Sequence, residues 1–454
     1  MAGEEREARQ TRCSLDYKDP SGRSKGRGEI RFKTSFRNTI YDAFQSRGWK
    51  ETSSEMDWDI HWCERDWMFG TFDHVHLESW QRVNHYRNDR ELCRKDLLVK
   101  NLKRQKKQLE KEKRTREAAL YDFWPTTFVL PGDYALFAEE FKRSGGAWIM
   151  KPIGSCQGRG IFLFTKLSQV SQWKSEHRWK PDNKDAEAYV VQRYIANPYL
   201  VAGKKFDMRI YALVTSFAPL TCYLYRAGFA RFTNVRYSNA TADMNNAFMH
   251  LTNVAIQKTA GNYDKDSGQK WDLRQLKLFM LSKHGSEATD RVFNEMQMII
   301  LRSLLAVQPV MINDKHCFEL YGYDIMIDDE FKPWLIEVNA SPSLSANTPD
   351  DYELKLQMLN SMLDVIDMDR RRDADSVEHQ LGGFDLIYHN GAMVLDPSSA
   401  YSTFLGADCP RPDPRAAAKA RSRPRKPKPS AADAAKAVLA AAKLKRGAKP
   451  KTTF

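Results

Sequence analysis

The sequence contains no long apolar run and no closely paired cysteines. No stretch of eighteen apolar residues occurs and the first residues are polar, so we expect neither membrane insertion nor a secretory signal. The seven cysteines are scattered without a CxxC pair, which argues against a disulfide framework and against a zinc site. We therefore expect an intracellular protein whose thiols are reduced.

An excess of positive charge is also missing from most of the chain. The formal net charge is +13, but residues 411–454 hold 14 lysines and arginines against two aspartates. The other 410 residues hold 57 basic and 56 acidic side chains. The part expected to fold therefore lacks a global positive field, and we predict no nucleic-acid partner. A helix predicted over Leu92–Leu120 is a local basic surface: either a solvated face or a docking surface for an acidic partner.

What the chain does have is ample material for a core. Hydrophobic residues make up 42% of the sequence and aromatic residues 11%, which is enough for two or three domains. Aromatic residues are dense between Ile30 and Phe72, so the globular part must begin there and bury them. From Trp124 to about Asn347, short β-rich runs alternate with helical stretches. This alternation predicts a mixed α/β (α+β) body.

Acidic residues interrupt two strongly β-forming runs around residue 330. Runs at 324–327 and 334–339, joined by a polar turn, predict a β-hairpin that places Asp324 across from Glu337. Two carboxylates about 4 Å apart repel by roughly 4 kcal/mol at an effective dielectric near 20, so either one is protonated or a cation lies between them. The oxygens of these acids and of Asn339 are ligands that Mg²⁺ uses together with substrate phosphates. Acids that face solvent from a half-exposed hairpin are the alternative.

A glycine-rich loop follows an apolar run at residues 147–164. Its glycines free the backbone to approach an anion, and Lys151 and Arg159 supply positive charge. A strand follows where a helix would follow in a Walker A or Rossmann loop, so we predict a hairpin whose tip covers phosphates. A plain hairpin turn is the alternative.

Further polar residues lie on other β-rich segments. In the run from Lys205 to Ile210, charged residues alternate with apolar residues, which predicts one charged face; a solvated edge strand would show the same pattern. The segment His250 to Lys258 is another β-rich run, interrupted by Thr252 and Asn253.

The order of these motifs resembles that of the ATP-grasp superfamily. More narrowly, KPIGSCQGRGI, KKFDMRIYALV, HLTNVAIQK and GYDIMIDDEFKPWLIEVNASPSL together resemble the tubulin tyrosine ligase-like family over about residues 30–370. The resemblance implies an α/β (α+β) ATP-grasp fold that holds a nucleotide between two α/β halves, with an N-terminal α/β domain and a disordered basic C-terminal tail. The implied division is a disordered arm (1–28), an N-terminal domain with the basic helix (29–120), a central ATP-grasp half (121–205), a C-terminal half with a metal site (206–370) and a mostly disordered tail (371–454).

The resemblance also implies ligands for these residues. ATP would be bound by Lys151, Gln157, Gly158, Arg159, Gly160, Gln192, Arg193, Tyr194, Ile195, Lys205, Phe206, Asp207, Thr252 and Asn253. Two Mg²⁺ ions would be bound by Asp324, Glu337 and Asn339. Substrate would be contacted by Gln157, Arg231 and Lys355. Lys151, Arg159 and Arg231 would be catalytic.

The implied reaction is ATP-dependent glutamylation of tubulin. A protein carboxylate is phosphorylated by ATP, and the acyl phosphate is attacked by the amine of free L-glutamate. Cations at Arg231 and Lys355 favour this dicarboxylate over glycine, although a glycine ligase and a non-catalytic microtubule-binding scaffold stay open. Expected partners are the acidic C-terminal tails of tubulin in microtubules, and accessory subunits. The expected location is the cytoplasm and cytoskeleton, in the axoneme and basal body of cilia or flagella.

Overall fold

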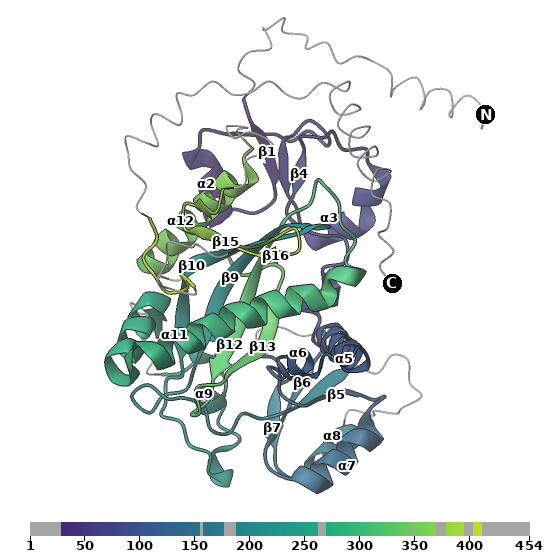
Figure 1. Cartoon of the computed structure of the whole chain (residues 1–454), viewed down its shortest axis with the longest axis vertical. Coiled ribbons are helices and arrows are strands. Elements are labelled where there is room, and N and C mark those ends of the chain that lie inside the picture. Colours follow the sequence, from purple (N-terminus) through teal and green to yellow (C-terminus); the bar gives the residue numbers. More distant parts are fainter. Residues whose placement is uncertain are drawn as a thin grey trace, which may run out of the picture.

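The structure is a computed structural model that describes residues 29–154, 158–176, 188–261, 269–346, 348–368, 378–394 and 403–410. These residues form a mixed α/β architecture built on three sheets (Figure 1). We call them the N-terminal sheet, the large sheet and the small sheet. The expected α/β class is confirmed.

The N-terminal sheet has four short parallel strands in the order β2-β1-β3-β4. The strands are β1 (Arg31–Thr34), β2 (Lys50–Glu51), β3 (Ile60–Trp62) and β4 (Arg82–Val83). The helices of this part are α2 (Thr39–Ser46), α3 (Arg65–Gly70) and the 3₁₀ turn η1 (Phe72–His74). Most of the aromatic side chains from this stretch are buried or partly buried in the hydrophobic clusters, as expected from their density.

The predicted basic helix is divided into three helices. They are α4 (Arg90–Cys93), α5 (Lys95–Lys111) and α6 (Thr115–Ala119). Arg94 has an extended backbone between α4 and α5, and Lys113 has a positive φ of 59° between α5 and α6. These two residues interrupt the helical hydrogen bonding, which the charge pattern alone did not predict.

The large sheet is antiparallel in its main path, in the order β13-β12-β9-β10-β15-β14, with β11 beside β10 and β16 beside β15. Its strands are β9 (Phe206–Phe217), β10 (Leu220–Phe232), β11 (Lys270–Asp272), β12 (Glu319–Ile327), β13 (Pro333–Asn339), β14 (Gln380–Leu381), β15 (Phe384–His389) and β16 (Ala392–Met393). The predicted hairpin is confirmed, because Asp324 and Glu337 are directly paired between β12 and β13. The alternative of an edge strand at Lys205–Ile210 is wrong, because β9 lies between β12 and β10.

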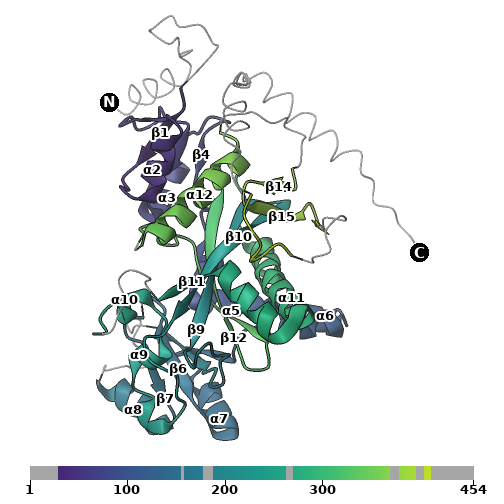
Figure 2. The same cartoon turned by 90° about the vertical axis from the view of Figure 1, so that its left-hand side faces the viewer.

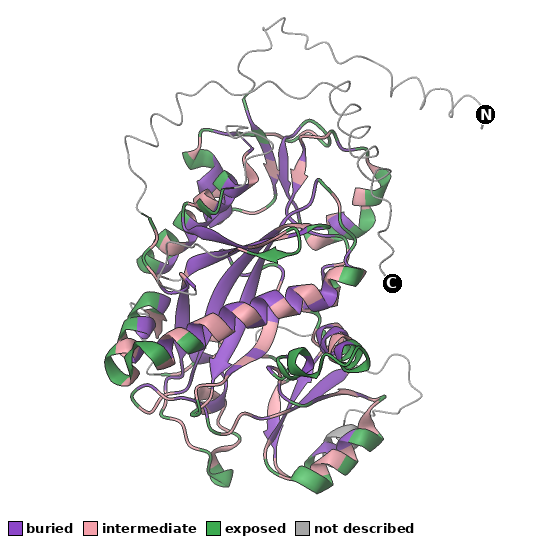
Figure 3. Cartoon of the chain, viewed as in Figure 1, coloured by how far each residue is buried: buried purple, intermediate pink, exposed green. Residues whose placement is uncertain are grey.

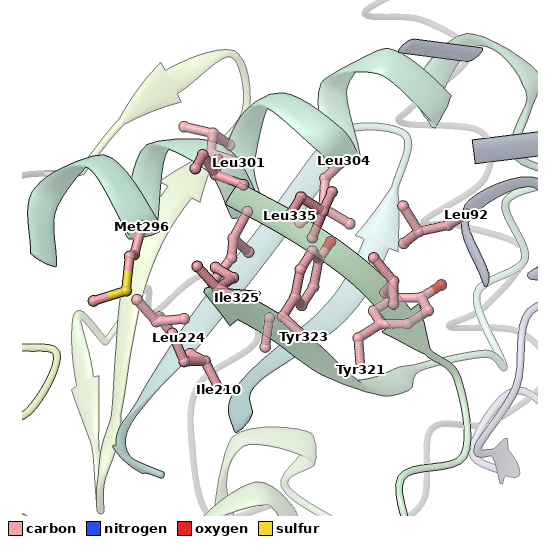
Figure 4. Packing of buried hydrophobic residues seen from close by; sticks show 14 of the residues in the cluster. Leu92, Ile210, Leu224, Met296, Leu301, Leu304, Tyr321, Tyr323, Ile325 and Leu335 are labelled. Carbon is pink, nitrogen blue, oxygen red and sulfur yellow. The ribbon is translucent and has the colours of Figure 1, made fainter. Parts of the chain in front are cut away.

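Helices cover both faces of the large sheet (Figures 1 and 3). One face packs against α11 (Leu273–Val307), which continues into the 3₁₀ turn η3 (Gln308–Val310), and the other packs against α12 (Pro349–Ile366) and the N-terminal sheet. Figure 4 shows the core between α11 and the large sheet, in which Ile325 and Tyr323 of β12 pack near Leu301 and Leu304 of α11. Each fully buried side chain of this size contributes about 1.5–3 kcal/mol, so this core fixes the strands that carry the acids.

The small sheet is antiparallel, in the order β5-β8-β6-β7. Figure 2 shows its strands β6 and β7 near α7 and α8 at the lower end of the molecule. Its elements are β5 (Thr127–Leu130), α7 (Tyr134–Ser144), β6 (Trp148–Pro152), β7 (Phe162–Phe164), α8 (Leu167–Glu176) and β8 (Tyr189–Arg193). It has its own core, in which Phe137 and Trp148 are fully buried. The chain enters this sheet after α6 and leaves it for β9.

Two segments differ from their predicted structure. Residues 250–258 are not a β-rich run: α9 (Ala247–His250) and α10 (Val254–Gln257) are single helical turns after the 3₁₀ turn η2 (Thr241–Asp243), and Asn246 accepts a hydrogen bond from the Phe248 amide at the start of α9. Part of the predicted tail, residues 378–394, forms β14, β15 and β16 of the large sheet. Apolar alternation in β15 allows this short return to bury its side chains against β10. Among the described helices, none has the length and apolar character needed to cross a membrane.

Candidate functional site

A pocket of about 830 Å³, including its part open to solvent, lies between the small and large sheets. Its walls come from β6 and β8 on one side, from β9, β10, β12 and β13 on the other, and from the segment that follows α9. The pocket brings together most of the predicted site residues: Lys151, Gly158, Gln192, Arg193, Tyr194, Ile195, Lys205, Asp207, Arg231, Thr252, Asn253, Asp324 and Glu337.

The other predicted residues that the structure describes do not line the pocket; among them are Asn339 and Lys355, whose contacts are described below. Gln157 lies outside the described residues. Arg159 and Gly160 belong to the loop between β6 and β7 but do not line the pocket. Phe206 is buried in the core beside Phe232, so its side chain cannot face a ligand in the pocket, because strand alternation directs it to the other face of β9.

The glycine-rich loop approaches the large-sheet side of the pocket at Gly158. This residue has a φ of 81°, and an added Cβ would lie 2.5 Å from Ile256 Cδ1 and 3.0 Å from Asn253 Oδ1. Only glycine fits both the backbone conformation and the space. The loop and the Thr252–Asn253 segment therefore lie next to each other at the pocket.

Lys151 supplies a buried ammonium group from β6. Its Nζ donates to Gln192 Oε1 on β8 at 2.8 Å, and Gln192 Nε2 donates to Thr127 Oγ1 on β5 at 3.0 Å. Burial lowers the pKa of Lys151 to about 8, although the charge of Glu337 acts in the opposite direction. Three strands of the small sheet thus hold one cation at the pocket wall.

Lys205 is a second buried ammonium group, directly before β9. Its Nζ donates to Tyr194 Oη and to the His250 carbonyl, both at 2.9 Å, and lies 4.5 Å from the Tyr194 ring centroid. Burial lowers the pKa of Lys205 to about 7, against the opposing charge of Asp207. The contacts to Tyr194 and His250 join the small sheet to the α9 segment across the pocket.

Asp324 is buried, and two arginines contact its carboxylate and offset its negative charge. Arg209 binds both of its carboxylate oxygens, and Arg231 Nη2 lies 2.8 Å from Asp324 Oδ2 while Arg231 also pairs with Asp207. Burial alone would raise the pKa of Asp324, but the two guanidinium groups outweigh burial and lower it. The prediction considered a protonated acid or a cation such as Mg²⁺ between the two acids, and it was incomplete because it omitted the arginine side chains that contact Asp324.

The carboxylate Glu337 and the amide Asn339 lie beside Asp324. Glu337 is partly exposed in the pocket, and its Oε2 lies 3.7 Å from Lys95 Nζ. Asn339 Nδ2 lies 3.5 Å from Glu337 Oε1 and donates to the Gly322 carbonyl at 3.3 Å. Hard oxygen atoms from paired strands at a pocket with open space fit Mg²⁺ bound together with phosphates.

A separate pair of lysines lies behind Arg231. Lys270 on β11 lies opposite Arg231 of β10 in the backbone pairing of the two strands. Its Nζ lies 3.1 Å from Asp351 Oδ2. Lys355 Nζ lies 3.1 Å from the same carboxylate oxygen and donates to the Ser345 carbonyl at 2.7 Å. Burial lowers the pKa of Lys270 to about 8. The predicted residues Arg231 and Lys355 therefore belong to one cationic cluster.

Sequence reasoning missed Lys95, Arg209 and Lys270 as site residues. The alternation of charge along β9 could have identified Arg209, because it shares a face with Lys205 and Asp207. Lys95 was included in the basic helix without a role of its own. Only the register of β10 and β11 reveals Lys270.

The fold and the pocket together define the class of the protein: an α/β protein with a charged ligand pocket between two sheets. The chain belongs to the tubulin-tyrosine ligase family, whose family model matches residues 74–374. It is 46% identical over 397 residues to the "Probable tubulin polyglutamylase TTLL9" of Bos taurus, covering 81% of this chain and 85% of that relative. It is 47% identical over 371 residues to the "Probable tubulin polyglutamylase ttll-9" of Caenorhabditis elegans, covering 81% and 86%.

A third relative shows a similar match. The chain is 44% identical over 384 residues to the "Probable alpha-tubulin polyglutamylase Ttll1" of Tetrahymena thermophila, covering 79% of this chain and 93% of that relative. The family resemblance predicted from the motifs is thereby confirmed.

Proposed function

We propose that the chain is an ATP-dependent tubulin glutamate ligase, or polyglutamylase, that joins free L-glutamate to γ-carboxylates in tubulin C-terminal tails. The observation that carries this proposal is the single pocket in which Lys151, Lys205, Asp324 and Glu337 meet. The names of the polyglutamylase relatives support the substrate. We also propose that the fold is of the ATP-grasp type, with the small and large sheets as its two halves.

The nucleotide would lie between the two sheets. Lys151 and the backbone at Gly158 would contact phosphates, while Gln192 to Ile195 would contact the adenine and Lys205, Asp207, Thr252 and Asn253 the ribose or phosphates. Lys95, 3.7 Å from Glu337, is placed to neutralise phosphate charge as well. Phosphoryl transfer depends mainly on positioning and charge neutralisation, and these residues supply both.

The metal site would use Asp324, Glu337 and Asn339. Two Mg²⁺ ions bound there would neutralise the charge that develops on the transferred phosphoryl group. Arg209 and Arg231 keep the Asp324 carboxylate ionised, which a metal ligand requires.

The reaction would proceed in two steps. A tail carboxylate oxygen attacks the γ-phosphorus and ADP leaves, which gives an acyl phosphate. The neutral amine of glutamate then attacks the acyl carbon, phosphate leaves, and an isopeptide bond forms. Arg231 would stabilise negative charge on the reacting groups, and Arg159 and Gln157 retain only the roles implied by the family resemblance.

The cationic cluster of Arg231, Lys270 and Lys355 supports glutamate as the amino acid. Each of these cations already faces an aspartate, Asp207 and Asp324 at Arg231 and Asp351 at the two lysines. The second carboxylate of glutamate can add a charge-assisted contact to this cluster that glycine cannot make. The basic surface of α5 and the segment 411–454 would contact acidic tubulin tails, with accessory subunits contributing. We further propose a cytoplasmic, cytoskeletal location in ciliary or flagellar axonemes and basal bodies.

Mass spectrometry of tubulin tails tests the proposal directly. The full chain is incubated with tubulin, ATP, Mg²⁺ and equal amounts of isotopically labelled glutamate and glycine. We expect mass additions of glutamate only, and none with Glu337→Gln, a variant whose thermal unfolding should match the wild type.

Two other results would replace the proposal. Addition of glycine alone would favour a glycine ligase. No addition, together with microtubule cosedimentation that is lost on truncation before Arg411, would favour a non-catalytic scaffold.

A further inference from the structure

The small sheet is joined to the rest of the molecule by two connections, and both are bound to the β12–β13 hairpin. In the first, the Leu335 amide donates to the Phe123 carbonyl at 2.8 Å. In the second, the Tyr199 amide donates to the Ile327 carbonyl at 2.9 Å and the Asp329 amide donates to the Asn197 carbonyl at 2.9 Å. The hairpin that carries Asp324 and Glu337 therefore also anchors the sheet that carries Lys151.

A cluster of three rings reinforces the second connection. Tyr199 comes from the connection, Phe331 from the hairpin turn and His284 from α11. Tyr199 Oη lies 2.8 Å from His284 Nε2, and the Phe331 ring lies 4.7 Å from the His284 ring and 5.3 Å from the Tyr199 ring. We call these residues the ring cluster. It links three segments that are far apart in the sequence.

The backbone around the ring cluster is unusual in two places. Phe331 has a φ of 63°, in the left-handed region that non-glycine residues rarely adopt. Gly285, directly after His284, has a φ of 81° and interrupts the helical backbone of α11, while Thr289 Oγ1 donates to the Gly285 carbonyl at 2.8 Å. The interruption redirects α11 at the residue that contacts Tyr199. Packing in the ring cluster offsets the conformational cost at Phe331.

We infer that Tyr199 and His284 form a positioning pair that fixes the small sheet relative to the carboxylate-bearing hairpin. Neither residue would touch the nucleotide. The pair holds the connection against the hairpin turn, and thereby sets the distance between Lys151 on one wall of the pocket and Glu337 on the other. Its effect on nucleotide affinity rests on the proposed function, whereas its effect on the connection does not.

Backbone hydrogen exchange of the full chain without nucleotide tests the pair independently of activity. In His284→Ala, we expect the Tyr199 and Asp329 amides to exchange about tenfold faster, because the connection opens more often. His284→Gln, which can still hydrogen-bond to Tyr199, should restore most of the protection. Exchange at the wild-type rate in His284→Ala would overturn the inference.

Ser303→Ala is the matched control. Ser303 Oγ lies 2.9 Å from Tyr323 Oη, so this variant also removes a hydrogen bond between α11 and the large sheet, but not one at the connection. It should lower the melting temperature without changing exchange at Tyr199 and Asp329. If hydrogen exchange at these two amides becomes equally faster in both variants, the pair contributes only to the overall stability of the fold. That result would overturn the inference.

Nucleotide affinity supplies the second readout. The dissociation constant of a non-hydrolysable ATP analogue with Mg²⁺, measured calorimetrically, should rise about fivefold in His284→Ala and stay unchanged in Ser303→Ala. An unchanged affinity in His284→Ala would overturn the positioning role. If the wild type itself does not bind the analogue, the proposed function fails, and the exchange result alone decides on the pair.

Discussion

Two buried carboxylates on β12, Asp324 and Glu319, lie five residues apart on opposite faces of the strand and have opposite electrostatic environments. Asp324 is bound by Arg209 and Arg231 at the edge of the pocket, and its pKa is lowered. Glu319 lies 2.8 Å from His85 Nδ1 and accepts from the Tyr86 amide, and burial raises its pKa to about 8, although the charge of Arg65 acts in the opposite direction.

The surroundings of Glu319 contain other titratable groups whose pKa values burial also shifts. Asp89, whose pKa burial raises to about 7, and His85 have ligand atoms within 4.8 Å of those of Glu319. Both ring nitrogens of His85, however, are engaged by Glu319 and by the Asn84 amide. Burial lowers the pKa of His85 to about 4, so the ring is neutral. Arg65 Nη2 lies 2.8 Å from Asp89 Oδ2, yet burial still raises the pKa of Asp89, whereas two arginines lower the pKa of Asp324.

The largest effect is expected from Asp324→Asn, which removes the ionised carboxylate of the two that are compared. The variant leaves Arg209 and Arg231 with one fewer carboxylate, and breaking a buried ion pair costs about 3–5 kcal/mol. Glutamate incorporation should fall at least about a hundredfold and the melting temperature should fall as well. In Glu337→Gln, where the side chain is partly exposed, activity should fall without the loss of stability. Equal destabilisation of the two variants would contradict the assigned charge balance.

A smaller effect is expected on nucleotide binding when a rise in pH removes the charge of Lys151. Because the pKa of Lys151 is lowered to about 8, the side chain is charged below pH 8 and neutral above it. The dissociation constant for the nucleotide analogue should therefore rise as pH increases above 8, by up to about tenfold per pH unit. Lys151→Arg keeps its charge, so its binding should change little between pH 7 and 9.5. Parallel profiles for the two proteins would assign the titration to another group.

An effect on one substrate alone is expected from Lys270→Met. Losing one charged contact to a carboxylate should raise the KM for glutamate about tenfold while the KM for ATP changes little, as measured by initial rates at saturating levels of the other substrate. Lys283→Met, an exposed position on α11, is the control. A rise in the KM for ATP instead would place Lys270 at the nucleotide.

The smallest effect is expected from replacing Glu319, the buried carboxylate whose pKa is raised. Glu319 has a folded-state pKa of about 8, above its ordinary value, so between about pH 4.5 and 8 the folded state binds more protons than the unfolded state. Stability therefore falls as pH rises through this window. The melting temperature of Glu319→Gln should fall less between pH 5.5 and 8 than that of the wild type, by a few degrees. Glu330→Gln, in the exposed hairpin turn, should keep the wild-type slope.

Much of the site could be predicted because its residues follow local patterns. The Asp324–Glu337 pair follows from the hairpin alternation, and Lys151 from its place before a glycine-rich loop. Local alternation places Arg209 on the charged face of β9, but it does not show which residue Arg209 balances. The contacts of Arg209 and Arg231 with Asp324 depend on the pairing of strands that are far apart in the sequence. Lys270 depends on strand register for the same reason. The β-rich prediction for residues 250–258 is wrong because their apolar content does not distinguish a strand from the single helical turn of α10.

The pairing of β15 with β10 has a practical consequence for the choice of recombinant fragments. The match to the family ends at residue 374, yet a fragment cut there would lack the strand that covers one side of β10. Such an uncovered strand presents free amides and carbonyls to neighbouring molecules and promotes self-association. Extending the fragment to Pro410 would retain Asp385, which pairs with Arg226, and Leu405, whose carbonyl accepts from Lys277. Soluble material for crystallisation or cryo-electron microscopy should therefore be sought with the longer boundary.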